Sequence, residues 1–394
     1  MGSIVTLGIG NLEIDWGKNN FFINHSKLFL KDDKKLISSE TFEGEVYEDW
    51  GYSRKLRDVK LRLDLLGYSM KGIEEKYNLI LQEYPDYYPE LNLSFQEFSD
   101  VITKVNINEI QLSEESLDHD LGEYVTKVIF SNPQFSALAE KIDVSDNDIG
   151  TFFENLDPYI QLRLLAENEI NLDLTVEWRT QDIVENGWVS EDELFEGVPE
   201  ESKFLVVTEG TSDSFVIQRA IELLRPDISD FFTYVDMEEH YPFSGTGNLY
   251  KFFQGLISIR IQNKCLFIFD NDAEGIEKYQ QALTLNKPDH LRVTKLPDLV
   301  EFENFLTVGP NGEQLSNVNG QAIAIECFLD LSFKNNKTPI IRWSSYKKSI
   351  GLYQGSLDDK DHYTKQFKKV KCHERDYDFS KLNILIDHLV QQCI

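Results

Sequence analysis

The chain has 394 residues, 41% of them hydrophobic and 12% aromatic, and a formal net charge of −29. This composition predicts a globular protein of two or three domains and excludes extensive disorder. No apolar run reaches the ~18–20 residues of a membrane span, and the start lacks the basic-then-apolar pattern of a signal peptide. The four cysteines form no CxxC pair, so we expect no zinc site and a cytoplasmic location.

The acidic charge restricts how this protein can bind nucleic acid. Affinity for a phosphate backbone comes mainly from Lys and Arg, and here 39 basic residues face 68 acidic ones. Charges further apart than ~8–10 Å are screened, so a local basic track is still possible. A nucleic-acid role therefore requires clustered Lys and Arg, or a divalent cation, at the substrate.

Residues 1–200 are predicted to form a mostly helical domain with a short β start. Residues 1–35 alternate apolar and polar side chains around Gly8 and Gly10, as a hairpin or an edge strand does. The polar run at residues 13–19 is either a binding surface or a strand followed by a turn.

Helical patterns follow this β start. One helix is expected over residues 54–82, with a break at 84–90. Ser94 and Glu97 form a capping box that predicts the start of the next helix. The acid-rich residues 180–202 are predicted to be a linker. Between the helix that starts at Ser94 and this linker, three further helices are expected, over residues 113–130, 132–142 and 148–168.

Carboxylates end two short apolar runs further along the chain. Glu209 follows the run 204–208, and Asp270 and Asp272 follow the run 264–269. Such runs are typical of buried parallel strands, whose carboxyl ends meet at one edge of a sheet. Carboxylates packed at one edge repel one another, so we expect a cation there, and oxygen ligands favour Mg²⁺ or Mn²⁺. The alternative is that these acids are helix caps and surface residues.

Alternating strands and helices surround these carboxylates and predict a parallel sheet with helices on both faces. Strands are expected over residues 204–208, 231–236, 264–269 and 291–296. Helices are expected over residues 212–224, 247–260 and 273–284.

A strand ending in Glu-Gly, a helix, and a later strand ending in Asp-x-Asp together resemble the Toprim domain of topoisomerases, bacterial primases and OLD-family nucleases. The resemblance covers roughly residues 203–331. It implies a Rossmann-like parallel sheet with flanking helices. The sequence AIECFL resembles an acidic helix of the OLD-like nuclease branch, which is therefore favoured. The metal-ligating residues that the resemblance implies are Glu209, Asp213, Asp270, Asp272 and Glu326.

Several of these assignments have alternatives. Asp213 can instead be a first-turn acid favoured by the helix dipole. Glu301 and Glu303 compete with Glu326 for the last carboxylate position. Lys295 either stabilises charge on a phosphoryl group during catalysis or pairs with the acids.

A small-residue loop and a basic C-terminal segment are the expected substrate contacts. The loop resembles the one found in OLD-type domains and opens a helix, where a phosphate can approach, although short Gly loops are common. Residues 332–394 mix basic and aromatic residues, which indicates either a nucleic-acid surface or an ordinary amphipathic tail. The substrate-binding candidates are Ser244, Gly245, Thr246, Asn248, Arg342, Lys347 and Lys348.

The start of the chain resembles the HEPN/Toprim N-terminal region that precedes Toprim domains in some prokaryotic proteins. HEPN-type ribonucleases carry a His four to six residues after an Arg. His25 and His119 do not follow an Arg at that spacing. We therefore expect residues 1–200 to be a scaffold or an oligomerisation domain, residues 201–331 to be the Toprim catalytic domain, and residues 332–394 to be a C-terminal extension.

Together these features predict a Mg²⁺-dependent nuclease acting on DNA or RNA, and the resemblance adds a role in prokaryotic anti-phage defence. The chain lacks a GxxxxGK[ST] loop, so any ATP dependence would require a partner ATPase. One alternative is a non-catalytic Toprim module that binds nucleic acid or a partner protein. Another is a phosphotransfer enzyme, against which the separate Glu209 and the absence of a DxDx[TV] motif argue.

Overall fold

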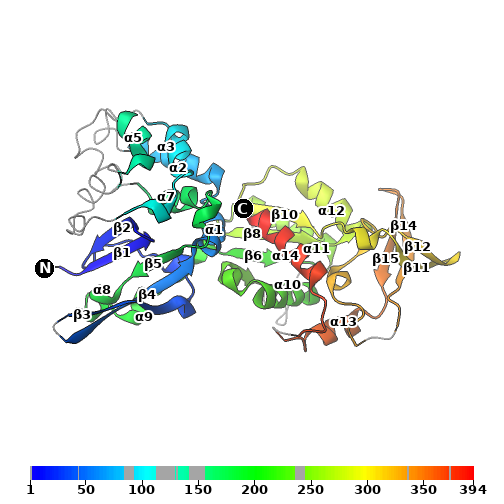
Figure 1. Cartoon of the computed structure of the whole chain (residues 1–394). Helices are drawn as coiled ribbons and strands as arrows, with labels where there is room; N and C mark the ends of the chain where they lie inside the picture. Colours follow the sequence, from blue (N-terminus) through cyan, green and yellow to red (C-terminus); the bar gives the residue numbers. More distant parts are fainter. Residues whose placement is uncertain are drawn as a thin grey trace. The chain divides into compact units, whose positions relative to one another are not determined.

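The computed structural model describes residues 2–42, 44–83, 93–111, 129, 132–141, 156–235, 245–334, 337–371 and 374–394. The chain divides into two compact units, Met1–Pro199 and Glu200–Ile394, called unit 1 and unit 2 below. Both units mix helices and strands (Figure 1). Within the described ranges, no helix combines the length and apolarity needed to cross a bilayer.

Unit 1 is built on a five-stranded antiparallel sheet in the order β2-β1-β5-β4-β3. β5 comes from the far end of the unit and pairs with both β1 and β4, so that Arg179 lies opposite Thr6 on one side and Gly51 on the other. The strands are β1 (Ile4–Ile9), β2 (Leu12–Lys18), β3 (Lys34–Phe42), β4 (Glu45–Lys55) and β5 (Thr175–Arg179).

Helices cover both faces of this sheet, with α2, α3, α5 and α7 on one side and α8 and α9 on the other (Figure 1). Leu7, Tyr159 and Trp178 are among the buried residues that join strands and helices into one core. The helices are α1 (Leu56–Leu65), α2 (Met70–Glu83), α3 (Phe95–Ile102), α5 (Ser136–Lys141), α7 (Pro158–Leu165), α8 (Gln181–Glu185) and α9 (Glu191–Leu194). Short 3-10 segments are Ser26–Leu28, Lys31–Asp33, Ile107–Glu109, Pro133–Phe135, Glu169–Asn171 and, at the start of unit 2, Glu200–Ser202.

The β content of unit 1 exceeds the prediction of a helical domain with a short β start. The hairpin of β3 and β4 was missed because residues 45–48 are exposed, so no apolar alternation marks the strand. The single helix expected over residues 54–82 is also wrong: Arg54 lies in β4, and α1 and α2 are separated at Gly67, whose φ is +90°. A positive φ suits glycine and ends the first helix there.

Among the other predictions for unit 1, one is confirmed and one is wrong. Ser94 caps α3 through the expected capping box with Glu97. Residues 180–199 are not a linker, because α8 and α9 bury Ile183 and Leu194 in the core of unit 1. The helix expected over residues 113–130, apart from residue 129, and the first part of that over 148–168 lie outside the described residues.

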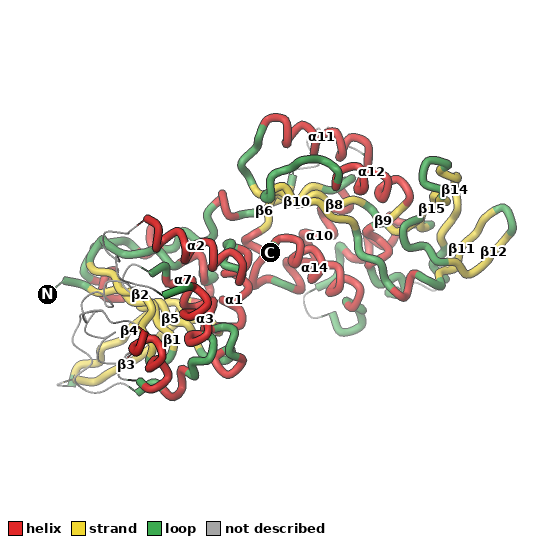
Figure 2. Tube along the Cα trace, turned by 90° about the horizontal axis from the view of Figure 1, so that it is seen from above, coloured by secondary structure: helices red, strands yellow, loops and turns green. Residues whose placement is uncertain are grey.

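Unit 2 contains a four-stranded parallel sheet in the order β10-β8-β6-β7. α11 and α12 lie on one face and α10 and α14 on the other (Figure 2). The strands are β6 (Phe204–Val207), β7 (Phe232–Tyr234), β8 (Lys264–Phe269) and β10 (Leu291–Lys295), and the helices are α10 (Thr211–Leu224), α11 (Thr246–Ile259), α12 (Ala273–Leu283) and α14 (Ser380–Cys393). These elements confirm the predicted alternation of strands and helices.

The strand order has a functional consequence. The chain runs from β6 to β7 on one side and then crosses to β8 on the other side of β6. In open parallel sheets, ligands bind beyond the carboxyl ends of the strands where the strand order reverses. The ends of β6 and β8 are therefore the expected location of a site.

Residues 300–394 add a second sheet, and their last helix, α14, packs on the parallel one. This sheet has the order β12-β11-β14-β15 and is formed by β11 (Phe305–Gly309), β12 (Gly312–Ser316), β14 (Ile341–Lys347) and β15 (Leu352–Leu357). β9 (Asn271–Asp272) and β13 (Ala322–Ile323) pair separately, and α13 (Lys360–Phe367) follows β15. The remaining 3-10 segments are Pro226–Phe231, Val300–Phe302 and η11 (Ile325–Phe328). The helix expected over residues 324–329 is thus only a 3-10 turn.

Candidate functional site

Two carboxylates meet where the central strands of unit 2 end. Glu209 lies just beyond β6, and Asp270 lies just beyond β8. Oε1 of Glu209 accepts a hydrogen bond of 3.0 Å from the backbone N–H of Asp270, and Oε2 accepts one from the Thr246 hydroxyl at the start of α11. Parallel pairing of β6 with β8 places these residues side by side. The Glu209 carboxylate is therefore fixed by two donors.

Asp272 is held at the beginning of α12. Its Oδ1 accepts a hydrogen bond of 2.7 Å from the backbone N–H of Gly275, and its Oδ2 accepts one from the side chain of Gln354 in β15. Gly275 must be a glycine, because a Cβ atom there would lie 2.1 Å from the backbone oxygen of Asp270. The turn after β8 thus packs Asp270 and Asp272 tightly against the first turn of α12.

Asp213 and Glu326 approach the same region from other elements. Asp213 lies in the first turn of α10, where its Oδ1 accepts a hydrogen bond of 3.4 Å from the hydroxyl of its neighbour Ser212. Glu326 lies on η11 and is only 4% exposed. Its Oε2 atom has no hydrogen-bond partner among the described residues, but lies 3.7 Å from the ammonium nitrogen of Lys360 on α13.

Burial and mutual repulsion set the protonation of these acids. Burial, opposed by hydrogen bonds and reinforced by Asp272, raises the pKa of Glu209 to about 7. Burial and the charge of Glu326 raise the pKa of Asp213 to about 7. Burial and the charges of Glu209 and Asp213 raise the pKa of Asp270 well above its ordinary value. A carboxylate group in such surroundings is stabilised by a nearby cation.

Lys360 is the cation that unit 2 itself supplies. Burial lowers the pKa of this lysine, but the charges of Glu326 and Asp270 outweigh it and raise the pKa overall. The sequence placed Lys360 only within the basic segment 332–394, because it lies 90 residues after Asp270 and reaches the acids only through the packing of α13. Its position beside the carboxylates could not be predicted from local patterns.

The carboxylate oxygens suit a hard cation by their chemistry, but their described positions do not form a metal-binding group. The chemistry consists of carboxylate oxygens alone, which Mg²⁺ and Mn²⁺ prefer, and one oxygen of Glu326 lacks a hydrogen bond. Within the described part of the chain, however, no three His, Cys, Asp or Glu side chains form a metal-binding group. Glu209 and Asp272 each accept one hydrogen bond on either carboxylate oxygen, and an oxygen that accepts one hydrogen bond retains a lone pair for a cation.

Other predicted residues have different surroundings. The ammonium group of Lys295 contacts Asp298 at 2.8 Å and the backbone oxygen of Leu296 at 3.3 Å. Glu301 and Glu303, the competitors of Glu326, are exposed. The structure therefore gives Lys295 a partner outside the carboxylate group.

The residues predicted to bind substrate also differ from one another in their surroundings. Ser244 lies outside the described residues. Gly245 and Asn248 are exposed at the start of α11, whereas Thr246 is buried against Glu209. Arg342 pairs with Asp358 at 2.8 Å, and Lys347 lies within 4 Å of Glu274 and Glu277. Lys348 is exposed in the turn between β14 and β15.

His25, near the start of unit 1, makes its contacts in the protein core. His25 is buried, and its Nδ1 and Nε2 lie 3.0 Å from the Tyr159 hydroxyl and 2.9 Å from a carboxylate oxygen of Asp15. Burial lowers the pKa of His25 despite the nearby carboxylate. His119 lies outside the described residues. The polar residues at the chain start thus include a partner for a core histidine.

Comparison with known proteins identifies unit 1. The family model called HEPN/Toprim N-terminal domain 1 matches residues 1–202, which confirms the expected HEPN/Toprim-associated region. No curated protein and no solved structure matches the chain. Because the matched residues make up just over half of the sequence, the chain belongs to the HEPN/Toprim N-terminal domain 1 family.

Proposed function

We propose that unit 2 is a Toprim domain of the OLD-like nuclease branch, which hydrolyses phosphodiester bonds in DNA or RNA with Mg²⁺ or Mn²⁺. The observation that carries this proposal is the meeting of Glu209 and Asp270 at the carboxyl ends of two adjacent parallel strands. Membership of the HEPN/Toprim N-terminal family supports it, because that domain is nuclease-associated.

The proposed ligands are Glu209, Asp213, Asp270, Asp272 and Glu326. A bound divalent cation would lower the pKa of a coordinated water and stabilise charge on the phosphate oxygens. With a cation bound, Glu209 and Asp270 would provide adjacent negative oxygens, and the hydrogen bond from the Asp270 backbone N–H to Glu209 keeps the two residues side by side. Lys360 neutralises Glu326 and lies close enough to the acids to draw an anionic phosphate towards them. We assign no catalytic role to Lys295, because Asp298 holds its ammonium group.

The biological setting is part of the proposal. We propose that the protein acts in prokaryotic anti-phage defence, with unit 1 as a scaffold that joins copies of the chain or recruits a partner such as an ATPase. The net charge of −29 supports control by a partner or by metal, since it opposes unassisted binding to nucleic acid.

The direct test is cleavage of plasmid DNA, single-stranded DNA and transfer RNA with Mg²⁺, Mn²⁺ or EDTA. Asp270→Asn should abolish cutting, and Glu301→Gln, which changes an exposed acid of the same unit, should not. A second readout does not need cutting: at saturating Mg²⁺ the wild-type melting temperature should rise, because a ligand that binds only the folded state stabilises it. Asp270→Asn should show no such rise.

A second candidate is a non-catalytic module. It is favoured by one observation, that the described acids form no metal-binding group while Lys360 already pairs with Glu326. This candidate predicts no metal-dependent cutting and no effect of Mg²⁺ on melting. Either cutting or a Mg²⁺-dependent rise that Asp270→Asn removes would exclude it.

A further inference from the structure

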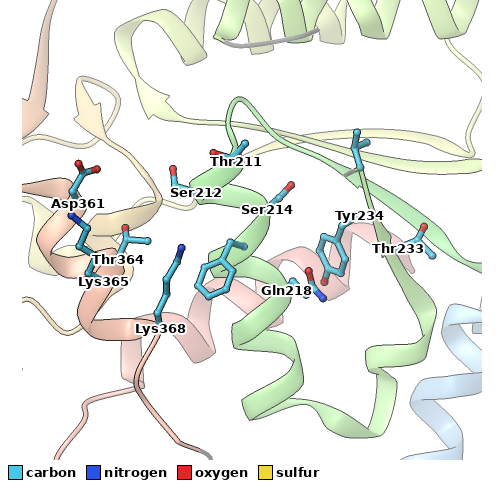
Figure 3. A pocket seen from close by; sticks show the side chains of 12 residues that line it. Thr211, Ser212, Ser214, Gln218, Thr233, Tyr234, Asp361, Thr364, Lys365 and Lys368 are labelled. Atoms are coloured by element: carbon cyan, nitrogen blue, oxygen red, sulfur yellow. The ribbon is translucent and has the colours of Figure 1, made fainter. Parts of the chain in front are cut away.

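A cavity of about 760 Å³ lies in unit 2 beside the carboxylates. It opens between the first two turns of α10, strand β7 and α13 (Figure 3). Its volume is within the range of ~300–1,000 Å³ found for small-molecule sites. Ser212 lines it and precedes Asp213 in the chain, and Asp361 lines it and follows Lys360. The cavity and the carboxylate group therefore share two helices.

The charge of this cavity differs from that of the chain as a whole. Lys365 on α13 and Lys368, the residue that follows this helix, line it, and Asp361 is the single acid among its lining residues. The side chain of Lys368 extends from the end of α13 towards α10 (Figure 3), and its ammonium nitrogen lies 4.7 Å from the centre of the Phe215 ring. Neither lysine has an ion-pair partner among the described residues, and both are exposed. In a protein with a charge of −29, an unpaired pair of lysines at one cavity favours an anion.

Neutral groups in the same cavity add hydrogen-bonding and stacking capacity. Thr211 and Ser212 offer hydroxyls at the start of α10, a helix of 14 residues with no side-chain cap. Phe215 and Tyr234 provide aromatic surface. The Tyr234 hydroxyl is buried and has no hydrogen-bond partner in the described part of the chain. A buried hydroxyl without a partner is costly, and a ligand in the cavity would satisfy it.

We propose that this cavity binds one nucleotide of the substrate strand, with its phosphate near Lys365 and Lys368 and its base against Phe215 and Tyr234. Cations with aromatic surface are the combination that holds single-stranded nucleic acid. The assignment to a substrate strand rests on the proposed nuclease function. The shared helices α10 and α13 then place the bound nucleotide next to the bond that the carboxylates cut.

Binding is tested separately from cutting, with a short fluorescein-labelled single-stranded oligonucleotide and the full chain in EDTA. Lys365→Ala and Lys368→Ala should each weaken binding about fivefold and lower the slope of log affinity against log salt by about 0.7. Lys369→Ala is the matched control, because Lys369 is exposed on the same segment but does not line the cavity. Tyr234→Phe should weaken binding without reducing the melting temperature, since the hydroxyl has no partner to lose.

Each outcome bears on the proposal. It is overturned if the Lys365→Ala, Lys368→Ala double variant binds the oligonucleotide as the wild type does, or if the wild type does not bind it. If the protein bound adenosine monophosphate but not the oligonucleotide, the cavity would be a site for a free nucleotide, and its assignment to a nucleic-acid strand would be overturned. If the wild type cuts and the double variant binds normally, the nuclease stands and the cavity site fails. If no substrate is cut but binding requires both lysines, the site stands and the nuclease function fails.

Discussion

The backbone N–H of Asp270 donates a hydrogen bond of 3.0 Å to Oε1 of Glu209, which joins the ends of β8 and β6. This contact makes the position of one carboxylate depend on the other strand. The side chain of Thr246 holds the second oxygen of Glu209. An acid fixed on both oxygens cannot move without disturbing the turn after β8.

Glu209→Gln should separate the charge of this residue from its shape. An amide oxygen can still accept the bond from Asp270, so we expect the free energy of unfolding to change by no more than about 1 kcal/mol. Phosphodiester cutting should fall at least about 100-fold, because a ligand charge is lost. Parallel urea unfolding and cleavage assays measure the two effects. Cutting at the wild-type rate would remove Glu209 from the mechanism.

Lys360 and Glu326 should show energetic coupling. Lys360→Met leaves the buried Glu326 carboxylate without a counter-charge, and we expect a loss of about 1–3 kcal/mol, reduced from fully buried pairs because Lys360 is partly exposed. Glu326→Gln in the Lys360→Met background should recover part of that loss. A double-mutant cycle on urea unfolding measures the coupling, and additive single effects would contradict it.

Two glycines of unit 2 provide a test of the turn that carries Asp270. Gly275→Ala would place a Cβ atom 2.1 Å from the Asp270 backbone oxygen, so the turn must shift. We expect a loss of more than about 2 kcal/mol and the loss of cutting. Gly255→Ala is the control, because this α11 glycine has free space around its Cβ position. It should stabilise the protein by about 0.5–1 kcal/mol. Equal effects of the two changes on melting temperature would refute this view of the turn.

Protonation of His25 should make unit 1 less stable in mild acid. Its pKa is lowered in the folded state by burial, so the unfolded chain takes up a proton first as the pH falls. Its contribution is complete above the unfolded pKa of about 6.5 and is lost as the pH drops from there towards the folded pKa. The groups facing it are Asp15, Tyr159, Lys27 and Asp157.

The measurement for His25 is a comparison with His25→Asn. Glu13 and Asp49 have raised pKa values, chiefly through burial, and contribute with the opposite sign, so the wild-type curve alone does not isolate His25. We expect the stability difference between wild type and variant to shrink as the pH falls from 7.5 to 5.5. Tryptophan fluorescence during urea unfolding, measured with Trp343 of unit 2 replaced by Phe, follows unit 1, which holds Trp16, Trp50, Trp178 and Trp188. A difference independent of pH would show that His25 is not kept neutral.

Local sequence patterns determined much of unit 2. The apolar runs that became β6 and β8 end directly in Glu209 and Asp270, and Gly275 follows at a fixed spacing. Burial on both faces of a parallel strand requires such runs, so the elements could be predicted from residues close together in the chain. The capping box at Ser94 is another local signal, because it involves residues only three positions apart.

Contacts between distant residues were decided by tertiary structure alone. Lys360 and Gln354 reach the acids only because α13 and β15 fold back on the parallel sheet, and Lys295 instead meets its near neighbour Asp298. In unit 1, the pairing of β5 with β1 and β4 joins residues at least 120 positions apart. The sequence by itself determined which residues end the strands, because hydrophobic patterning acts locally. Which cation stands beside the carboxylates, and which cavity adjoins them, depended on long-range packing that no local pattern records.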